Sequence, residues 1–367
     1  MTASFENTKV LITSMGMDIG GAETYVLELC KELRRRGLEV FVASNGGVYE
    51  TELIAHGVKH FKVPMHNKKI SNLITSYNSL KRIIEDNDIN LVHAHARIPA
   101  FICGLLQKRM KHKFRFVTTA HAHFSKVFAY KLLSNWGEAT LAVAEDIQDN
   151  LINNFKLPKE QIRMTVNGIN TEKFNGNTNF SGILKEFDLS PQSRRIVNVG
   201  RIDRDMSHAA HRLIDITPQL HQKDKNLRII IVGHGNDFEN VKSRANAVNQ
   251  QLGAQIVILT GTRTDINKFL AAAHIFVGVS RSAMEAMICG IPAVLAGGQG
   301  YIGIFEPSKL ASAMSTNFTA RGFEAVTAEN LRRDLSNLLD ASPDKLRQLG
   351  DFGRETIRKH YSVKRMA

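Results

Sequence analysis

Apolar and polar residues alternate along the chain with two periods, one typical of strands and the other of helices. In the first half, short β-rich runs precede longer stretches in which apolar residues recur three and four positions apart. Gly37 stands where the first of these helices should end. The pattern predicts strands over 9–14, 39–43, 90–93 and 114–119, and helices over 22–36, 70–84 and 98–106. Strands and helices that alternate in this way predict a parallel sheet covered on both faces.

The second half repeats the arrangement. Strands are expected over 195–199, 227–232, 255–259, 275–279 and 293–295, with helices over 238–252, 283–289, 331–339 and 346–361. The stretch 175–193 is rich in Asn, Ser and Gly and lacks periodicity, which predicts a join between domains. We therefore expect an α/β protein with two doubly wound, Rossmann-like domains facing a central cleft, 1–180 and 190–345. The last helix, near 350–367, is expected to pack back on the first domain. Ligands of such sheets bind beyond the C-terminal ends of the strands.

Composition excludes several classes of protein. The chain has 367 residues, and its three cysteines are far apart, which predicts buried core residues rather than a disulfide framework: Cys30, Cys103 and Cys289. The N-terminus lacks the basic and apolar regions of a signal peptide, and no apolar run is long enough to span a bilayer. We therefore expect a cytoplasmic protein.

The charge balance is strongly basic. Lys and Arg number 48 against 35 Asp and Glu, a net charge of +13. Such an excess favours phosphate-bearing ligands, anionic membranes or nucleic acid. Nucleic acid is not expected, because aromatic platforms and a recognised motif are missing. The segment 105–115 mixes basic residues with Leu105, Leu106 and Met110. It is either a solvated helix end or a site of peripheral binding to the inner membrane face.

A glycine-rich loop containing Gly20 and Gly21 follows the first strand. It is not G-x-G-x-x-G, and Ala43-Ser44-Asn45 ends the second strand without a ribose-binding acid, which argues against a nicotinamide cofactor. A strand-to-helix turn of this kind brings backbone N–H groups to a phosphate. The alternative is a tight turn without a ligand.

Two His-x-His pairs stand at the C-terminal ends of expected strands, His93 with His95 and His121 with His123. Side chains two residues apart in a strand share a face, so the pairs are expected to converge at one rim. A metal site is one interpretation. We favour polar contacts to substrate and expect no metal, because no carboxylate or cysteine nearby completes a ligand set.

Three successive strands of the second half end in glycine with polar or basic residues: Gly200-Arg201, Gly233-His234-Gly235 and Gly261-Thr262-Arg263. Close backbone approach and arginine suit a nucleotide diphosphate. Ser282 is expected to cap a helix whose first-turn N–H groups also suit a phosphate. Glu285, one turn further, either accepts bonds from sugar hydroxyls or is an acid favoured near a helix N-terminus.

Taken in order, these motifs resemble glycosyltransferase family 4, the retaining GT-B enzymes. The resemblance spans most of the chain and rests on Gly20-Gly21-Ala22-Glu23, Val92-His93-Ala94-His95, His121, Asn167-Gly168-Ile169-Asn170, Gly200-Arg201, Gly233-His234-Gly235 and the stretch from Glu285 to Pro292.

The resemblance implies a hexosyltransferase-like enzyme that moves a sugar from a nucleotide-sugar to a glycan, lipid-linked or protein acceptor with retention of configuration. UDP-sugar is favoured over GDP-sugar, and neither metal nor cofactor is used. By resemblance His121 contacts the transferred sugar, Arg201 the diphosphate and Glu285 the ribose. The other donor-binding residues would be Gly20, Gly21, Gly200, Gly233, Gly235, Arg263, Ser282, Ala283 and Met284, with His93, His95 and His123 on the acceptor side.

Two positions depart from the family pattern. Met206 stands where a second phosphate-binding lysine is usual, and Val277 stands where the family has a glutamate eight residues before Glu285. Arg204 or His208 could supply the missing cation. The departures keep two alternatives open: a non-catalytic or regulatory GT-B protein that binds nucleotide-sugar, and a GT-B sugar-nucleotide epimerase.

Overall fold

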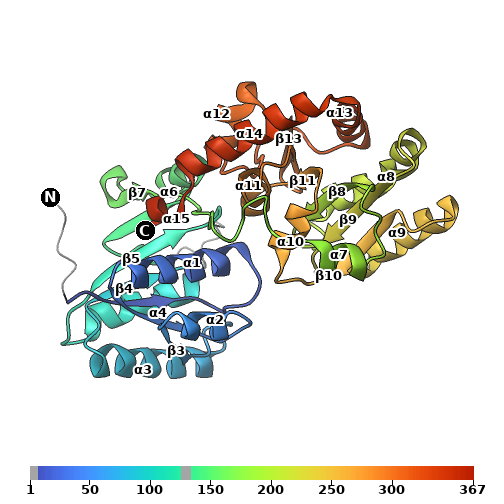
Figure 1. Cartoon of the computed structure of the whole chain (residues 1–367). Helices are drawn as coiled ribbons and strands as arrows, with labels where there is room; N and C mark the ends of the chain where they lie inside the picture. The colour runs from blue at the N-terminus through green and yellow to red at the C-terminus, as the bar shows by residue number, and fades with distance from the viewer. Residues whose placement is uncertain (1–6, 125–133) are drawn as a thin grey trace. The chain divides into compact units, whose positions relative to one another are not determined.

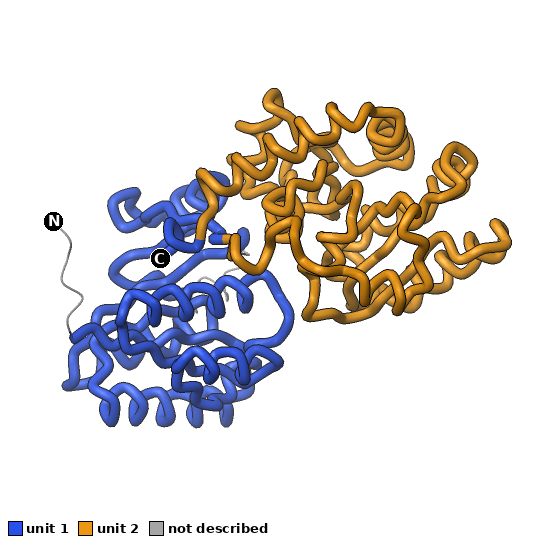
Figure 2. Tube along the Cα trace, in the orientation of Figure 1, with its two compact units in different colours: residues 1–168, 363–367 blue, residues 169–362 orange. Residues whose placement is uncertain are grey.

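The computed structural model of the chain describes residues 7–124 and 134–367. The chain divides into two compact units (Figure 2): the first unit is Met1–Gly168 with Val363–Ala367, and the second unit is Ile169–Ser362. Each is built on a largely parallel sheet with helices packed against it (Figure 1). The expected α/β class with two Rossmann-like domains is confirmed.

The described part of the first unit has a seven-stranded parallel sheet in the order β3-β2-β1-β4-β5-β6-β7. Its strands are β1 (Lys9–Thr13), β2 (Glu39–Ser44), β3 (Lys59–Lys62), β4 (Leu91–Ala94), β5 (Arg115–Ala120), β6 (Ala139–Ala142) and β7 (Ile162–Met164). Its helices are α1 (Gly21–Arg35), α2 (Glu50–Ala55), α3 (Ile70–Asp86), α4 (Arg97–Arg109), α6 (Glu145–Phe155) and α15 (Val363–Met366).

Both faces of this sheet are buried, which the strand sequences explain. In β1, Val10 and Ile12 belong to one apolar cluster with α1 and α6, whereas Leu11 belongs to another with α3 and α4. Successive residues of a strand point to opposite faces, so a strand buried on both sides must be apolar throughout. The free cysteines Cys30 and Cys103 are buried in these clusters, as expected.

The second unit has a six-stranded sheet in the order β10-β9-β8-β11-β12-β13, parallel except for β13. Its strands are β8 (Arg194–Val199), β9 (Leu227–Val232), β10 (Val257–Gly261), β11 (Ile275–Gly278), β12 (Ala293–Gly297) and β13 (Gly300–Ile304). Its helices are α7 (Ser181–Glu186), α8 (His208–Lys223), α9 (Phe238–Leu252), α10 (Ile266–Ala271), α11 (Ser280–Ile288), α12 (Leu310–Ser315), α13 (Ala328–Asp340) and α14 (Pro343–His360).

The units divide at Gly168, earlier than the boundary near 180 that the sequence suggested. The stretch expected as a join contains α7, which packs on the second unit: Ile183 is buried, and Glu186 forms an ion pair with Arg263. Its Asn, Ser and Gly residues hid this helix because they weaken the helical period.

The C-terminal helix also differs from expectation. α14 packs against α11 within the second unit, and only the short α15 returns to the first unit, where it contacts α1. Gly350 of α14 lies so close to the backbone of Gly290 that a Cβ would overlap the carbonyl oxygen. Close packing at this glycine holds α14 on the second unit.

In the part of the chain that the structure describes, no helix has both the length and the apolar character needed to cross a membrane.

Candidate functional site

The strand order of the second unit places the end of β8 at a switch point. β8 pairs with β9 on one side and with β11 on the other, so the chain leaves β8 and β11 in opposite directions. Ligands of open α/β sheets bind at such points, beyond the C-terminal ends of the strands. Gly200 and Arg201 follow β8, and α11 begins two residues after β11. The candidate donor site is this edge of the sheet.

The glycines that follow β9 are explained by packing within the chain. Gly233 has φ 145°, and a Cβ there would overlap the carbonyl oxygen of Gly200. A Cβ at Gly235 would meet the backbone of Ile202. The loops after β8 and β9 therefore lie against each other, as the sequence suggested. The glycines serve this backbone contact, and their contact with a donor stays a prediction.

The two arginines expected at the donor site have different surroundings. The side chain of Arg201 is 65% exposed, with Nη1 3.6 Å from Asp203 Oδ2. Arg263 is held by two carboxylates: Nε donates to Asp265 at 2.9 Å and Nη1 to Glu186 at 2.5 Å. These hydrogen bonds raise the pKa of Arg263. Arg201 is the more accessible of the two guanidiniums, and the role of both arginines at the donor stays a prediction.

Ser282 does not cap α11, contrary to the expectation from sequence. The helix begins at Ser280, and Ser282 Oγ donates to the carbonyl oxygens of Val199 (2.9 Å) and Val279 (3.1 Å). Its hydroxyl therefore ties the first turn of α11 to the end of β8. Ala283 and Met284 follow and are both fully buried, so their contact with a donor stays a prediction.

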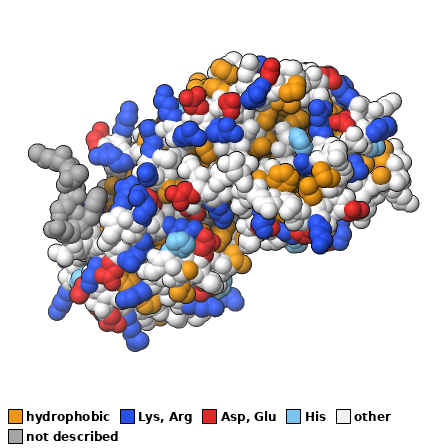
Figure 3. Space-filling model, in the orientation of Figure 1, with side chains coloured by type: hydrophobic (Ala, Val, Ile, Leu, Met, Phe, Trp, Pro, Cys, Tyr) orange, Lys and Arg blue, Asp and Glu red, His pale blue; other side chains and the backbone are white. Residues whose placement is uncertain are grey.

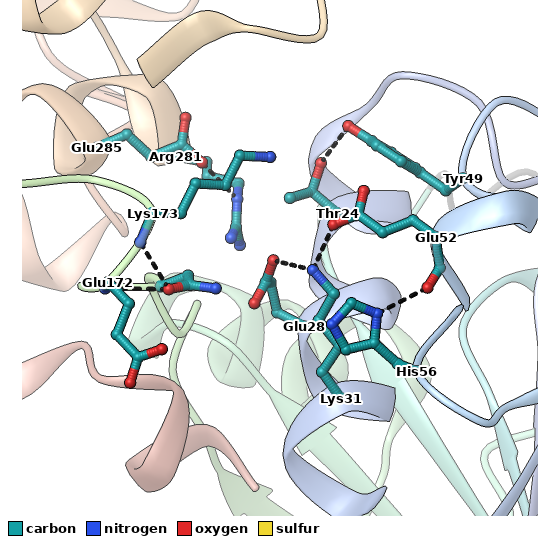
Figure 4. Close-up of polar contacts among 11 residues, drawn as sticks. Thr24, Glu28, Lys31, Tyr49, Glu52, His56, Glu172, Lys173, Arg281 and Glu285 are labelled. Carbon is teal, nitrogen blue, oxygen red and sulfur yellow. Dashed lines mark hydrogen bonds and ion pairs between the residues drawn. The ribbon is translucent and has the colours of Figure 1, made fainter. Parts of the chain in front are cut away.

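Glu285 lies one turn into α11 and is paired with an arginine that the sequence analysis did not assign to the site. Arg281 Nε donates to Glu285 Oε1 at 2.9 Å, and both residues are 7% exposed (Figure 4). Their i, i+4 spacing on a helix was the signal that could have revealed the pair.

The departure at Val277 has a structural consequence. Val277 is fully buried in the core cluster of the second unit, within β11. Its side chain serves the core, so this position offers no contact to a donor sugar. Met206 is partly buried, and its backbone N–H donates to the carbonyl oxygen of Asp203 at 2.8 Å.

The first unit has its own switch point at β1, which pairs with β2 and β4. His93 lies in β4, and its Nε2 is 2.7 Å from Thr119 Oγ1. His95 Nδ1 is 3.0 Å from His121 Nε2, and the two rings stack with centroids 5.3 Å apart. His123 instead bonds the carbonyl oxygen of Asp146 at 3.1 Å. Three of the four histidines converge, and the fourth does not.

Burial sets the protonation state of two of these histidines. Desolvation, aided by the nearby His121, lowers the pKa of His93 to about 3. Burial also lowers the pKa of His95 well below its usual range. Both imidazoles are therefore neutral near pH 7. They can exchange hydrogen bonds with hydroxyl groups without carrying charge.

Tyr25 of α1 completes this cluster and was missed at the sequence level. It is fully buried, and its ring meets the His121 ring edge-on with centroids 4.7 Å apart. The preceding glycine loop positions it, because α1 begins at Gly21 and Thr24 bonds the Gly20 carbonyl oxygen through both N–H and Oγ1. A Cβ at Gly21 would meet no atom of the described residues within 4 Å, so no contact with them requires glycine there.

Comparison with known proteins agrees with this geometry. Residues 19–173 match the family model described as Glycosyltransferase Family 4, and residues 193–309 match the model described as Glycosyl transferases group 1. EpsF of Bacillus subtilis, a glycosyltransferase by name, is 23% identical over 312 residues, 78% of each chain. The N-acetyl-alpha-D-glucosaminyl L-malate synthase of Bacillus anthracis is 20% identical over 302 residues, 75% of each chain.

Solved structures share the fold over nearly the whole chain. A glycosyltransferase from Rickettsia africae superposes with a TM-score of 0.78 at 18% identity, covering 98% of this chain and 96% of that one. HepE from Anabaena, solved in complex with UDP-glucose, gives a TM-score of 0.75 at 16% identity with the same coverage. The chain belongs to the family 4 (group 1) glycosyltransferases and has the GT-B fold, because two family models match it in succession and its relatives and its fold agree with them.

Proposed function

We propose that this glycosyltransferase moves a sugar from a nucleotide-sugar, with UDP-sugar favoured, to a glycan, lipid-linked or protein acceptor with retention of configuration. The observation that carries the proposal is the switch point of the second unit. There Arg201 and the first turn of α11, with Glu285, follow the adjacent strands β8 and β11. The UDP-glucose bound to the similar HepE supports the choice of UDP.

Each residue has a defined role in this proposal. Arg201, with its exposed guanidinium, binds the diphosphate. The Ser280 N–H donates to Phe318 O, so the next N–H groups of α11, those of Arg281 and Ser282, bind the diphosphate oxygens, because helix geometry leaves them without intrahelical partners. Glu285 accepts bonds from the ribose hydroxyls. On the acceptor side, His121 contacts the transferred sugar, supported by the neutral His95. Cationic groups and helix N–H groups stabilise the leaving diphosphate, with no metal or cofactor.

Calorimetric titration with UDP, uridine and GDP tests the donor site. Arg201→Ala should weaken UDP binding by about tenfold or more, because a hydrogen bond to a charged group contributes roughly 1.5–3 kcal/mol, and it should leave uridine unaffected. Glu285→Ala should weaken both UDP and uridine. Arg228→Ala is the matched control, since Arg228 lies near the opposite end of the strands, in β9. If Arg201→Ala and Glu285→Ala both bind UDP and uridine with wild-type affinity, the proposed donor site is wrong.

A binding protein without transferase activity is the second candidate, and the burial of Val277 favours it. Measuring the release of UDP from a UDP-sugar distinguishes the transferase from the binding protein. Turnover supports the transferase, whereas donor binding at micromolar concentrations with no UDP release over hours supports the binding protein. Chelator treatment is expected to leave any turnover unchanged, and a loss that added metal restores would contradict the metal-free site.

A further inference from the structure

Arg281 is the second residue of α11 and stands at the switch point of the second unit. The chain turns sharply there: Ser280 has φ 57°, in the left-handed region, and donates its N–H to Phe318 O at 2.6 Å. The bond from Ser282 to Val199 fixes the same turn to the end of β8. The backbone that carries Arg281 is therefore held from two sides, next to the loop that begins with Gly200.

The guanidinium of Arg281 is buried and only partly paired. Its Nε donates to Glu285, as Figure 4 shows. Nη1 and Nη2 are both inaccessible to solvent, and neither has a hydrogen-bond partner within 7–124 or 134–367. One edge of the guanidinium thus meets a carboxylate, and the other edge, with two nitrogens side by side, meets no acceptor.

Buried guanidinium N–H groups without acceptors are costly, and the same unit shows how a structural arginine avoids that cost. Arg195 is 4% exposed, and its guanidinium is satisfied by backbone acceptors: Nε donates to Ala272 O at 2.6 Å and Nη1 to Ser193 O at 2.7 Å. Desolvation of a charged group without partners is strongly unfavourable. The arrangement at Arg281 is therefore that of a residue whose partner comes with a ligand.

We propose that Arg281 is a donor-binding residue whose Nη1–Nη2 edge takes a pair of anionic oxygens from the nucleotide-sugar. This rests on the function proposed above. The planar fork of arginine matches two oxygens of a phosphate or carboxylate. Glu285 orients the fork through Nε, and the N-terminal turn of α11 favours an anion beside it. The oxygens belong either to the diphosphate or to a carboxylate on the donor sugar. Arg281 thereby supplies a cation that position 206, occupied by Met206, does not.

Titration of the full chain with uridine, UDP, UDP-glucose and UDP-glucuronate tests the proposal. Arg281→Lys keeps the charge and can still meet Glu285, but it loses the fork. If the diphosphate is the anion, affinity for UDP and both sugars should fall by about tenfold or more with uridine unchanged. If the sugar carboxylate is the anion, only the affinity for UDP-glucuronate should fall. Arg195→Lys, at the opposite end of β8, controls for loss of a buried arginine and should leave every affinity unchanged.

Wild-type affinity of Arg281→Lys for all three nucleotides would overturn the role of Arg281. Thermal melting checks that the variant folds. If Arg281→Lys does not fold, Arg281→Gln carries the same expectations, because an amide can still donate to Glu285. If the wild-type protein binds none of the nucleotides, both the proposed function and the role of Arg281 are rejected. If the wild-type protein binds them and the Arg281 variant binds them equally well, only the role of Arg281 is rejected.

Discussion

Single residues decide how the loops of the donor edge fit together. Gly233 combines a positive φ with direct contact to the Gly200 carbonyl, and Gly235 contacts Ile202. In the sequence, these glycines suggested close approach of the backbone to a phosphate. The structure gives them a role that exists without a ligand, since side chains there would separate two loops that must be adjacent.

Gly233→Ala should therefore destabilise the protein by roughly 2 kcal/mol or more, because the Cβ adds backbone strain to a clash with a carbonyl oxygen that cannot rotate away. Gly182→Ala is the matched control. Gly182 lies in the first turn of α7, and a Cβ there would meet no atom within 4 Å in the part of the chain that the structure describes. Alanine should stabilise that helix by about 0.5–1 kcal/mol. Urea unfolding measures the free energy of unfolding of both variants. Equal values for Gly233→Ala and Gly182→Ala would contradict the packing of Gly233 against the Gly200 carbonyl.

At the scale of elements, the ends of β4 and β5 bring His93, His95 and His121 together. Side-chain alternation in strands predicted that both His-x-His pairs meet at one rim, and His123 is the exception, because it bonds Asp146 instead. The structure adds that His93 and His95 are buried neutral, which ties the stability of the first unit to pH.

For His93 the pKa falls from 6.5 to about 3 on folding. Between these values the unfolded chain binds a proton that the folded chain does not, so the free energy of unfolding decreases as pH falls through this window. His93→Gln should reduce this acid sensitivity by up to about 1.4 kcal/mol per pH unit. Thr119→Val removes the hydroxyl partner but keeps the imidazole, so it should lower stability without flattening the slope. Thermal melts from pH 4 to 7 that show parallel slopes for wild type and His93→Gln would contradict the burial of a neutral imidazole.

Over the whole molecule, the net charge of +13 is spread widely, and Lys and Arg side chains are scattered over the face shown in Figure 3. The segment 105–115 was one candidate for membrane contact. Leu106 and Met110 are buried in the core and Leu105 is partly buried, so most of its apolar surface is unavailable to lipid, whereas Lys108, Arg109 and Lys111 are exposed. Contact with a membrane there would be electrostatic.

We expect salt-sensitive binding to anionic vesicles without insertion, because each surface basic residue near anionic lipid contributes roughly 1 kcal/mol, which salt screens. Co-sedimentation with vesicles containing phosphatidylserine should fall sharply between 50 and 300 mM salt. Replacing Lys108, Arg109 and Lys111 by Gln should weaken it, whereas the same change at Lys223, Lys225 and Arg228 is the control. Equal binding to neutral and anionic vesicles would exclude this interpretation.

The sequence by itself determined the alternation of strands and helices, the two Rossmann-like domains and the family. These features follow from short-range periodicity and from motifs whose members are neighbours in the chain. It missed four strands: β3, β6, β7 and β13. β3 and β7 are short edge strands that carry exposed residues, and β6 has only four residues, so they lack a continuous apolar signal. β13 is buried but contains two glycines, which weaken a strand pattern.

Only the tertiary structure decided which side chains meet. Ser282 was expected to cap a helix, but its hydroxyl donates to the carbonyl oxygen of Val199, 83 positions earlier. His123 was expected to join the other histidines, but it bonds the carbonyl oxygen of Asp146. The pair of Arg281 and Glu285 could be read from helical spacing, yet the two unpaired nitrogens of Arg281 could not. Partners distant in sequence come together through packing of whole elements, and whether a buried group finds a partner depends on every element around it.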